Sequence, residues 1–446
     1  MKKNLFIKST IILIIGGLLT KLLGILIRVI MTRNSNLEVV SLYMLIMPTF
    51  SLMMAISQLG FSTGISKVVS ENSDSSKKIL FSILPISIFI NIILTIFLVF
   101  TSRFIAFNLL KNESAYLPIL SISLVLPFDS LSSILRGFFF GKEKMIPHVI
   151  SNLAEQIIRL LFMLFILPHI LYKGIIFTTT CLILINVISE SFSSIVLIFF
   201  LPKSFKIEKK DLIPSFKCSK NVLDTSLPTT ATRIIGTISY FFEPIILTFI
   251  LTRCGYSNYF ILTEYGIINA FVMPILLLPG FFTGAISSAL LPVISREYSK
   301  GNIKYSKKKL KQALAISLII GLISTILIFI FRDYLLVFLY KTTNGSDYIK
   351  NISFVFLLYY IEAPLASFLQ ATNNSNLMMY DNFIGIIFKT IFLVVLSFIP
   401  GIGLYSLLIS SSINILITTI RHLKHIKIIL KKNKKLYYGF LFHFIN

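Results

Sequence analysis

Three basic residues stand inside long apolar runs of the sequence, where an ionised side chain is hardest to accommodate. Lys21 and Arg28 are seven residues apart and share one face of a helix, and Arg233 lies in a later run. A charge at the bilayer centre is costly unless it pairs or faces water, so these cations predict a water-filled cavity that binds an anion. Alternatively, they pair with acids of other helices and only tie the bundle together. The acids of other helices that could pair with them are Asp129, Glu190, Glu243 and Glu362.

Further polar residues follow one helical face or stand alone in an apolar run. Ser151, Glu155 and Arg159 are each four residues apart, so Glu155 and Arg159 can pair within a helix or act in transport. Glu243 follows two phenylalanines and precedes Pro244. This carboxylate could carry a coupling proton or sodium ion, or could satisfy a nearby arginine.

Several chemistries are missing from the sequence. It contains no GxxxxGK[ST] phosphate loop, no HExxH and no GxSxG elbow. The three cysteines are far apart, and His422 and His425 lie in a lysine-rich tail where we expect a solvated basic face. The sequence therefore predicts neither an enzyme nor a cofactor nor a metal site, and a secondary transporter is the working class.

The composition is that of an integral membrane protein. Of 446 residues, 55% are hydrophobic and 13% are charged, against roughly 25% charged in ordinary soluble domains. Runs long enough to cross a bilayer, about 20 residues each, predict an all-α fold with twelve transmembrane helices. The runs lie at 8–31, 39–64, 79–101, 116–138, 147–168, 175–201, 222–251, 262–292, 310–331, 351–371, 378–399 and 402–420.

The basic residues are distributed unevenly between the two sides of these predicted helices. Lysine and arginine concentrate at the N-terminus, in alternate loops and in the C-terminal tail. This asymmetry predicts a multi-pass protein of the cytoplasmic membrane with both termini in the cytoplasm. The formal net charge of +24 then reflects topology and attraction to anionic headgroups, so no nucleic-acid partner is predicted.

The two halves of the chain resemble each other. TKLLG at 20–24 matches TRIIG at 232–236, and GFSTG at 60–64 matches GFFTG at 280–284. The GxxxG spacing at 60–64 and at 280–284 predicts close helix packing in both segments. We predict an N-terminal six-helix lobe over 1–201, a basic cytoplasmic linker over 202–221, a C-terminal six-helix lobe over 222–420 and a basic tail over 421–446. Two lobes with the same orientation are typical of transporters, with substrate between them.

The region that joins predicted helices four and five carries a more specific pattern. LRGFFFG at 135–141 is followed by Met145, Pro147, Ser151, Glu155, Gln156 and Arg159. This pattern resembles the stage V sporulation protein B group of polysaccharide exporters, in the superfamily of lipid II flippases, O-antigen flippases and MATE drug exporters. Further matches cover 60–71 and 265–302. Arg136 thereby joins Ser151, Glu155 and Arg159 as a candidate gating residue.

The resemblance implies a V-shaped, two-lobe bundle that moves lipid-linked sugars across the cytoplasmic membrane. The implied cargo is an undecaprenyl-pyrophosphate saccharide for cell-wall, spore-cortex or surface polysaccharide. Lys21, Arg28 and Arg233 would meet its pyrophosphate, and polysaccharide or peptidoglycan synthesis enzymes are possible partners. Members of the group carry two further spans, which in lipid II flippases form a groove for the isoprenoid tail.

Two other functions are compatible with the sequence. A MATE-like, ion-coupled exporter of organic cations would need a cavity lined by carboxylates, which the cations at 21, 28 and 233 disfavour. A membrane scaffold would recruit sporulation or wall-synthesis enzymes through its basic loops.

Overall fold

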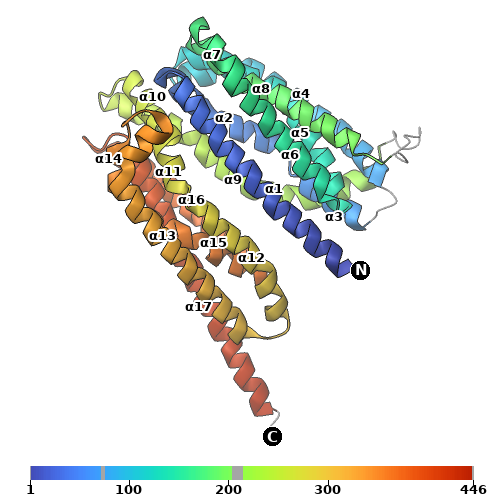
Figure 1. The fold of residues 1–446 in the computed structure, drawn as a ribbon. Helices are drawn as coiled ribbons and strands as arrows, with labels where there is room; N and C mark the ends of the chain where they lie inside the picture. The colour runs from blue at the N-terminus through green and yellow to red at the C-terminus, as the bar shows by residue number, and fades with distance from the viewer. Residues whose placement is uncertain (1, 72–75, 203–213, 444–446) are drawn as a thin grey trace. The chain divides into compact units, whose positions relative to one another are not determined.

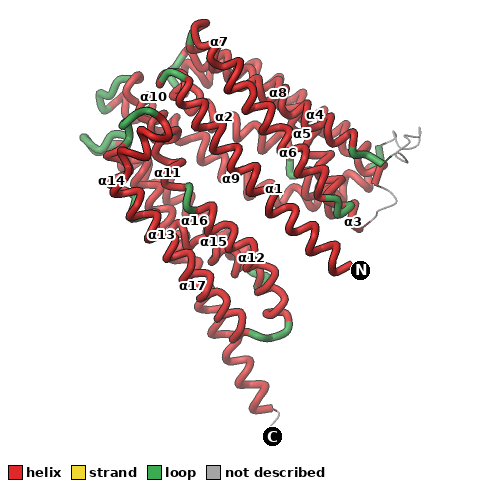
Figure 2. The backbone as a smooth tube through the Cα atoms, in the orientation of Figure 1, coloured by secondary structure: helices red, strands yellow, loops and turns green. Residues whose placement is uncertain are grey.

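The computed structural model describes residues 2–71, 76–202 and 214–443, and these ranges contain helices and loops but no strand (Figure 2). The chain divides into two compact units (Figure 1). Unit 1 comprises Met1–Thr252 and Ser257–Gly266, and unit 2 comprises Arg253–Tyr256 and Ile267–Asn446. The division into two six-helix lobes remains a prediction, and 203–213 of its linker lie outside the described residues.

Unit 1 is built around one central helix, α5. Its helices are α1 (Lys2–Asn34), α2 (Leu37–Gln58), α3 (Phe61–Glu71), α4 (Ser76–Phe104), α5 (Tyr116–Gly141), α6 (Met145–Leu161), α7 (Leu167–Ile170), α8 (Ile175–Phe199), α9 (Phe216–Arg253) and α10 (Asn258–Ile267). α5 packs against α2, α3, α4 and α8, while α6 packs between α8 and α1. This arrangement brings α5, α6 and α8 together around a shared interior.

Unit 2 has the same kind of organisation around α15. Its helices are α11 (Met273–Leu277), α12 (Gly280–Ser299), α13 (Ile303–Tyr340), α14 (Ser346–Ile352), α15 (Phe356–Ala371), α16 (Ser375–Ser397) and α17 (Tyr405–His443). α15 packs against α12, α13, α16 and α17. Leu290, Leu310, Leu365 and Ile426 belong to one buried apolar cluster, which joins α12, α13, α15 and α17.

Within the described ranges, eleven helices are long and apolar enough to cross a membrane. A twelfth span is counted if the pair α14–α15, bent by 61°, crosses as one unit. The predicted all-α, multi-span fold is therefore confirmed. The last candidate span, Tyr405–Lys431, continues beyond the predicted end at residue 420 because α17 is an uninterrupted helix.

Glycines permit the closest helix contacts in unit 1. A Cβ placed on Gly137 or Gly141 would lie 2.8 Å from the carbonyl oxygen of Ser62 or Ser66 on α3, respectively. A Cβ on Gly64 would lie 2.6 Å from the carbonyl oxygen of Val222, which supports the packing role predicted for the 60–64 pair. In the matching 280–284 segment, a Cβ on Gly280 would lie 2.7 Å from Cε1 of Tyr359, which also supports close packing, whereas a Cβ on Gly284 would meet nothing within 4 Å.

Gly141→Leu is therefore expected to lower the free energy of unfolding by about 2 kcal/mol, because overpacking a tight contact typically costs 1–3 kcal/mol. Equilibrium unfolding in detergent measures the effect. Gly236→Leu is the matched control, because a Cβ at Gly236 has open space. An equal decrease in the free energy of unfolding of both variants would show that the close contact with α3 is not the reason for a glycine at position 141.

Candidate functional site

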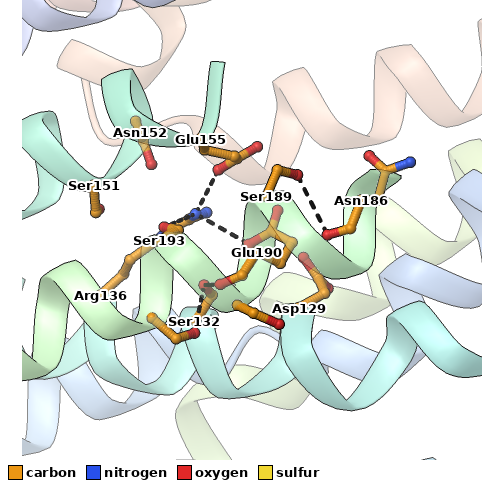
Figure 3. A network of polar contacts seen from close by, with 12 residues as sticks. Asp129, Ser132, Arg136, Ser151, Asn152, Glu155, Asn186, Ser189, Glu190 and Ser193 are labelled. Carbon is orange, nitrogen blue, oxygen red and sulfur yellow. Dashed lines mark hydrogen bonds and ion pairs between the residues drawn. The ribbon is translucent and has the colours of Figure 1, made fainter. Parts of the chain in front are cut away.

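A group of charged side chains lies in the interior of unit 1, where α5, α6 and α8 meet (Figure 3). Arg136 extends from α5, Glu155 and Arg159 from α6, and Glu190 from α8. The four-residue spacing of α6 places Glu155 and Arg159 on one face, as the sequence predicts. We call these four residues the Arg136 cluster.

In the Arg136 cluster each arginine contacts both glutamates. Arg136 Nη2 lies 2.7 Å from Glu155 Oε2 and 3.3 Å from Glu190 Oε2. Arg159 Nη2 lies 2.8 Å from Glu155 Oε1 and 3.5 Å from Glu190 Oε1. The two positive and two negative charges balance, so the cluster neutralises itself and offers no net charge to a ligand.

Burial and hydroxyl groups reinforce this pairing. The glutamate side chains are 8% and 4% exposed, and the arginine side chains 18% and 23%. Arg136 also donates to Ser193 Oγ at 3.0 Å, and Arg159 Nε donates to Ser189 Oγ at 3.1 Å. Because α8 supplies both serines and Glu190, the cluster fixes α8 against α5 and α6.

A second polar chain connects the interior of unit 1 to Arg233. The amide nitrogen of Gln58 donates to both oxygens of the buried Asp129 carboxylate, at 2.8 and 2.7 Å. The amide oxygen of Gln58 accepts a hydrogen bond from Arg233 Nη1 at 2.5 Å. Asp129 thus holds the Gln58 side chain in place, and Gln58 in turn positions the guanidinium of Arg233.

The predicted cationic residues all occupy exposed positions of unit 1. Lys21 and Arg28 lie on α1, and Arg233 lies on α9. Arg28 lies within electrostatic reach of Tyr43 on α2 and Tyr240 on α9. These three residues are therefore more exposed than the arginines of the Arg136 cluster.

The other predicted site residues are buried. The Ser151 hydroxyl donates to the carbonyl oxygen of His148, one turn earlier in α6, at 2.9 Å. This bond belongs to the helix itself and not to the Arg136 cluster. Glu243 is 5% exposed within α9. The transport roles proposed for both residues remain predictions.

Sequence reasoning missed two members of this polar interior. Glu190 is predicted only as a possible partner of the cations at 21, 28 and 233, although its helix carries a signal for the site. Asn186, Ser189, Glu190 and Ser193 form a polar stripe along one helical face. Gln58 carried no such signal, because a single neutral amide at the end of an apolar helix is unremarkable in sequence. Gln58 belongs to the site because it contacts Asp129 and Arg233, which lie on helices far from it in the sequence.

The expectation of a solvated face at His422 and His425 is wrong. Asp381 on α16 is fully buried and accepts from Arg421 Nε at 2.9 Å and from His425 Nδ1 at 2.8 Å. His422 is also fully buried, with Nδ1 at 2.8 Å from the carbonyl oxygen of Thr418. The reason is that α17 remains packed on α16 past residue 420, and Asp381 supplies the acid that the local sequence lacks.

Comparisons with known proteins identify relatives over most of the chain. The model of a family described as "Polysaccharide biosynthesis protein" matches residues 6–298, and the MatE model matches 233–396. Stage V sporulation protein B of Bacillus subtilis (strain 168) is 33% identical over 433 residues, covering 95% of this chain and 83% of that protein. Lipid II flippase MurJ of the same organism is 20% identical over 420 residues, covering 86% and 76%.

Solved structures show the same fold at lower identity. An inward-facing multidrug resistance MATE family transporter of the MOP superfamily aligns with a TM-score of 0.74 and 14% identity, covering 93% of this chain and 96% of that chain. A MOP superfamily transporter from Pyrococcus furiosus aligns with a TM-score of 0.60 and 14% identity, covering 97% and 96%. These similarities concern the architecture of the helices and not the substrate.

Proposed function

Because the chain belongs to the polysaccharide biosynthesis protein family, within the MOP superfamily of membrane transporters, we propose that it is a flippase for a lipid-linked saccharide. The proposed cargo is an undecaprenyl-pyrophosphate saccharide used for cell-wall, spore-cortex or surface polysaccharide. The proposed location is the cytoplasmic membrane with both termini in the cytoplasm, where polysaccharide or peptidoglycan synthesis enzymes would be partners. Its similarity to a stage V sporulation protein and to a lipid II flippase supports this cargo class.

One observation carries the proposal for the headgroup site. Arg233 is exposed, yet Gln58 and the buried Asp129 fix its guanidinium. A pyrophosphate carries at least two negative charges and is well suited to a cation held in place before binding. Lys21 and Arg28 supply further exposed cations on α1. In the proposed mechanism these residues bind the headgroup during alternating access while the isoprenoid chain stays in lipid.

The Arg136 cluster has a different part in this proposal. Its charges are satisfied internally, so binding an anion there would require breaking existing ion pairs. It holds α5, α6 and α8 together, and α6 in turn packs against α1, which carries Lys21 and Arg28. Glu243 remains the candidate for ion coupling, since a buried ionisable group within a span is a functional candidate by default.

Lys21→Ala combined with Arg233→Ala is expected to reduce retention of undecaprenyl-pyrophosphate saccharide by at least about tenfold. Each lost charge-assisted contact is worth roughly 1.5–3 kcal/mol. Native mass spectrometry of protein purified in mild detergent measures the retained lipid. The matched control, Lys217→Ala with Lys220→Ala, removes two exposed cations from the start of α9 and should leave retention unchanged.

The results of this experiment distinguish the proposed flippase site from other sites and from another function. Equal retention by the wild type and the Lys21/Arg233 variant would place the lipid elsewhere and refute the site. A second candidate function, export of organic cations, is favoured by the MatE match over 233–396 and by the buried Glu243. Binding of cationic dyes without any retained lipid would replace the flippase proposal with that exporter.

A further inference from the structure

Four lysines form one stripe at the beginning of α13. Lys304, Lys307, Lys308 and Lys311 recur at spacings of three and four residues, so they share a helical face. All four are exposed, and together with Gln312 and Ala315 they line an open groove of about 420 Å³. We call these four residues the α13 lysine stripe.

The direction of the stripe is set by the packing of α13. On the opposite face Ser306, Leu310 and Ala313 are buried, and this helix packs against α12 and α15. The lysines therefore point away from the core of unit 2. Their positions are not explained by a requirement of helix packing.

The positive charge of the stripe is not cancelled by neighbouring acids. Within the described ranges, no ion pair engages any of the four lysines. Glu297, at the end of the preceding helix, is shared by Arg296 and Lys300, at 3.5 and 3.9 Å. Four uncompensated cations in one groove favour an anionic ligand.

The groove is continuous with a surface suited to acyl chains. Following the stripe along α13 at the same helical spacing, Leu318, Leu322 and Ile326 are 38%, 43% and 48% exposed. α13 is one of the candidate membrane spans, so these side chains face hydrocarbon. The lysines accordingly lie where the helix leaves the hydrocarbon and enters the headgroup layer.

We propose that the α13 lysine stripe binds a phospholipid with two phosphate groups, of the cardiolipin type. Lys304 and Lys311 are seven residues apart, or about 10 Å along the helix axis, so the stripe is long enough for two phosphates to bind side by side. Two phosphates match this spacing, and the acyl chains lie along the exposed apolar face of α13. Basic clusters beside a span attract anionic lipid.

The competing explanation is that these lysines only orient the protein in the membrane, which requires positive charge but no particular helical face. Lys304→Gln/Lys307→Gln/Lys311→Gln tests the difference. The matched control, Lys424→Gln/Lys427→Gln/Lys431→Gln, removes three exposed lysines with identical spacing from α17. The two helices are at a similar depth, because Leu310 and Ile426 share one buried cluster.

Native mass spectrometry after equilibration with cardiolipin, phosphatidylglycerol and phosphatidylcholine provides the measurement. We expect the wild type and the α17 variant to bind cardiolipin with equal affinity, and the α13 variant at least about tenfold more weakly, with unchanged melting temperatures. Equal weakening in both variants would show unspecific attraction to surface charge. No weakening in the α13 variant, no preference for cardiolipin over phosphatidylglycerol, or capture of an isoprenoid pyrophosphate instead of phospholipid would each overturn the proposal.

Discussion

Glu190→Gln is expected to lower the free energy of unfolding by about 3 kcal/mol or more, because removing one partner of a buried ion pair typically costs 3–5 kcal/mol. The substitution keeps the shape of the side chain but leaves two arginines with one carboxylate. Arg136 and Arg159 are largely buried and would then share Glu155 alone. Equilibrium unfolding in mixed micelles, together with thermal stability by fluorescence-detected gel filtration, measures the loss.

A double-mutant cycle makes this prediction specific to the Arg136 cluster. Arg136→Gln should be similarly destabilising, but the double variant Arg136→Gln/Glu190→Gln leaves the balanced pair Glu155–Arg159 within α6. The double variant should therefore be about 0.5–3 kcal/mol more stable than the sum of the single losses predicts, the usual range for directly contacting groups. Additive losses would mean that Arg136 and Glu190 stabilise the protein independently.

A control and a second readout separate stability from transport. Glu38→Gln removes an exposed carboxylate at the start of α2 and should change stability by no more than a few tenths of a kcal/mol. If the Arg136 cluster bound the lipid headgroup itself, Arg136→Gln would abolish lipid retention even in preparations that remain folded. We expect folded Arg136→Gln protein to retain lipid.

The helical fold was predictable because each apolar run in the sequence of a membrane protein marks the position and length of a membrane-spanning helix. The predicted runs missed local breaks within several of the spans, such as the bend of 61° between α14 and α15. The run at 39–64 is divided at Leu59 and Gly60, which have positive φ values of 41° and 62°. The run at 262–292 is divided between α11 and α12, near Pro279. A glycine or proline in an apolar run marks such a break only ambiguously, since both residues are common in membrane helices.

The candidate site was predictable only where its partners are close in sequence. Glu155 and Arg159 are four residues apart, and their pairing within α6 follows from helical geometry. Glu190 and Gln58 reach their partners across 54 and 71 residues, respectively. Such residues come into contact only when the helices pack together, and this packing depends on the fit of side chains along whole helices and not on a local sequence pattern.

Whether a titratable side chain near the end of α17 is buried depends on the neighbouring helix more than on the composition of the local sequence. A lysine-rich sequence suggested a solvated face at His422 and His425, yet both histidines approach the buried Asp381 of α16. Gly385 allows this close approach, because a Cβ there would clash with Asn414 and Thr418 of α17. A glycine one turn beyond an aspartate on α16 is thus part of the same helix interface.

Asp381→Asn is expected to destabilise the protein by about 3 kcal/mol, for the same physical reason as Glu190→Gln. Asp381 is fully buried and is the described acid that binds both Arg421 and His425. Without its charge, the Arg421 guanidinium, only 30% exposed, loses its partner in a poorly solvated position. Equilibrium unfolding and limited proteolysis between α16 and α17 measure the effect, with the exposed Asp347→Asn as the matched control in unit 2.

The decisive comparison is the rescue variant Asp381→Asn/Arg421→Gln. If the loss in Asp381→Asn comes from an orphaned cation, removing that cation should recover at least about 1 kcal/mol, as expected for a directly coupled pair. If Asp381 instead acts mainly by filling space or by binding His425, the second substitution will add to the damage. Recovery would establish that α17 is held on α16 by charge pairing beyond the predicted end of its span, which the sequence alone assigned to solvent.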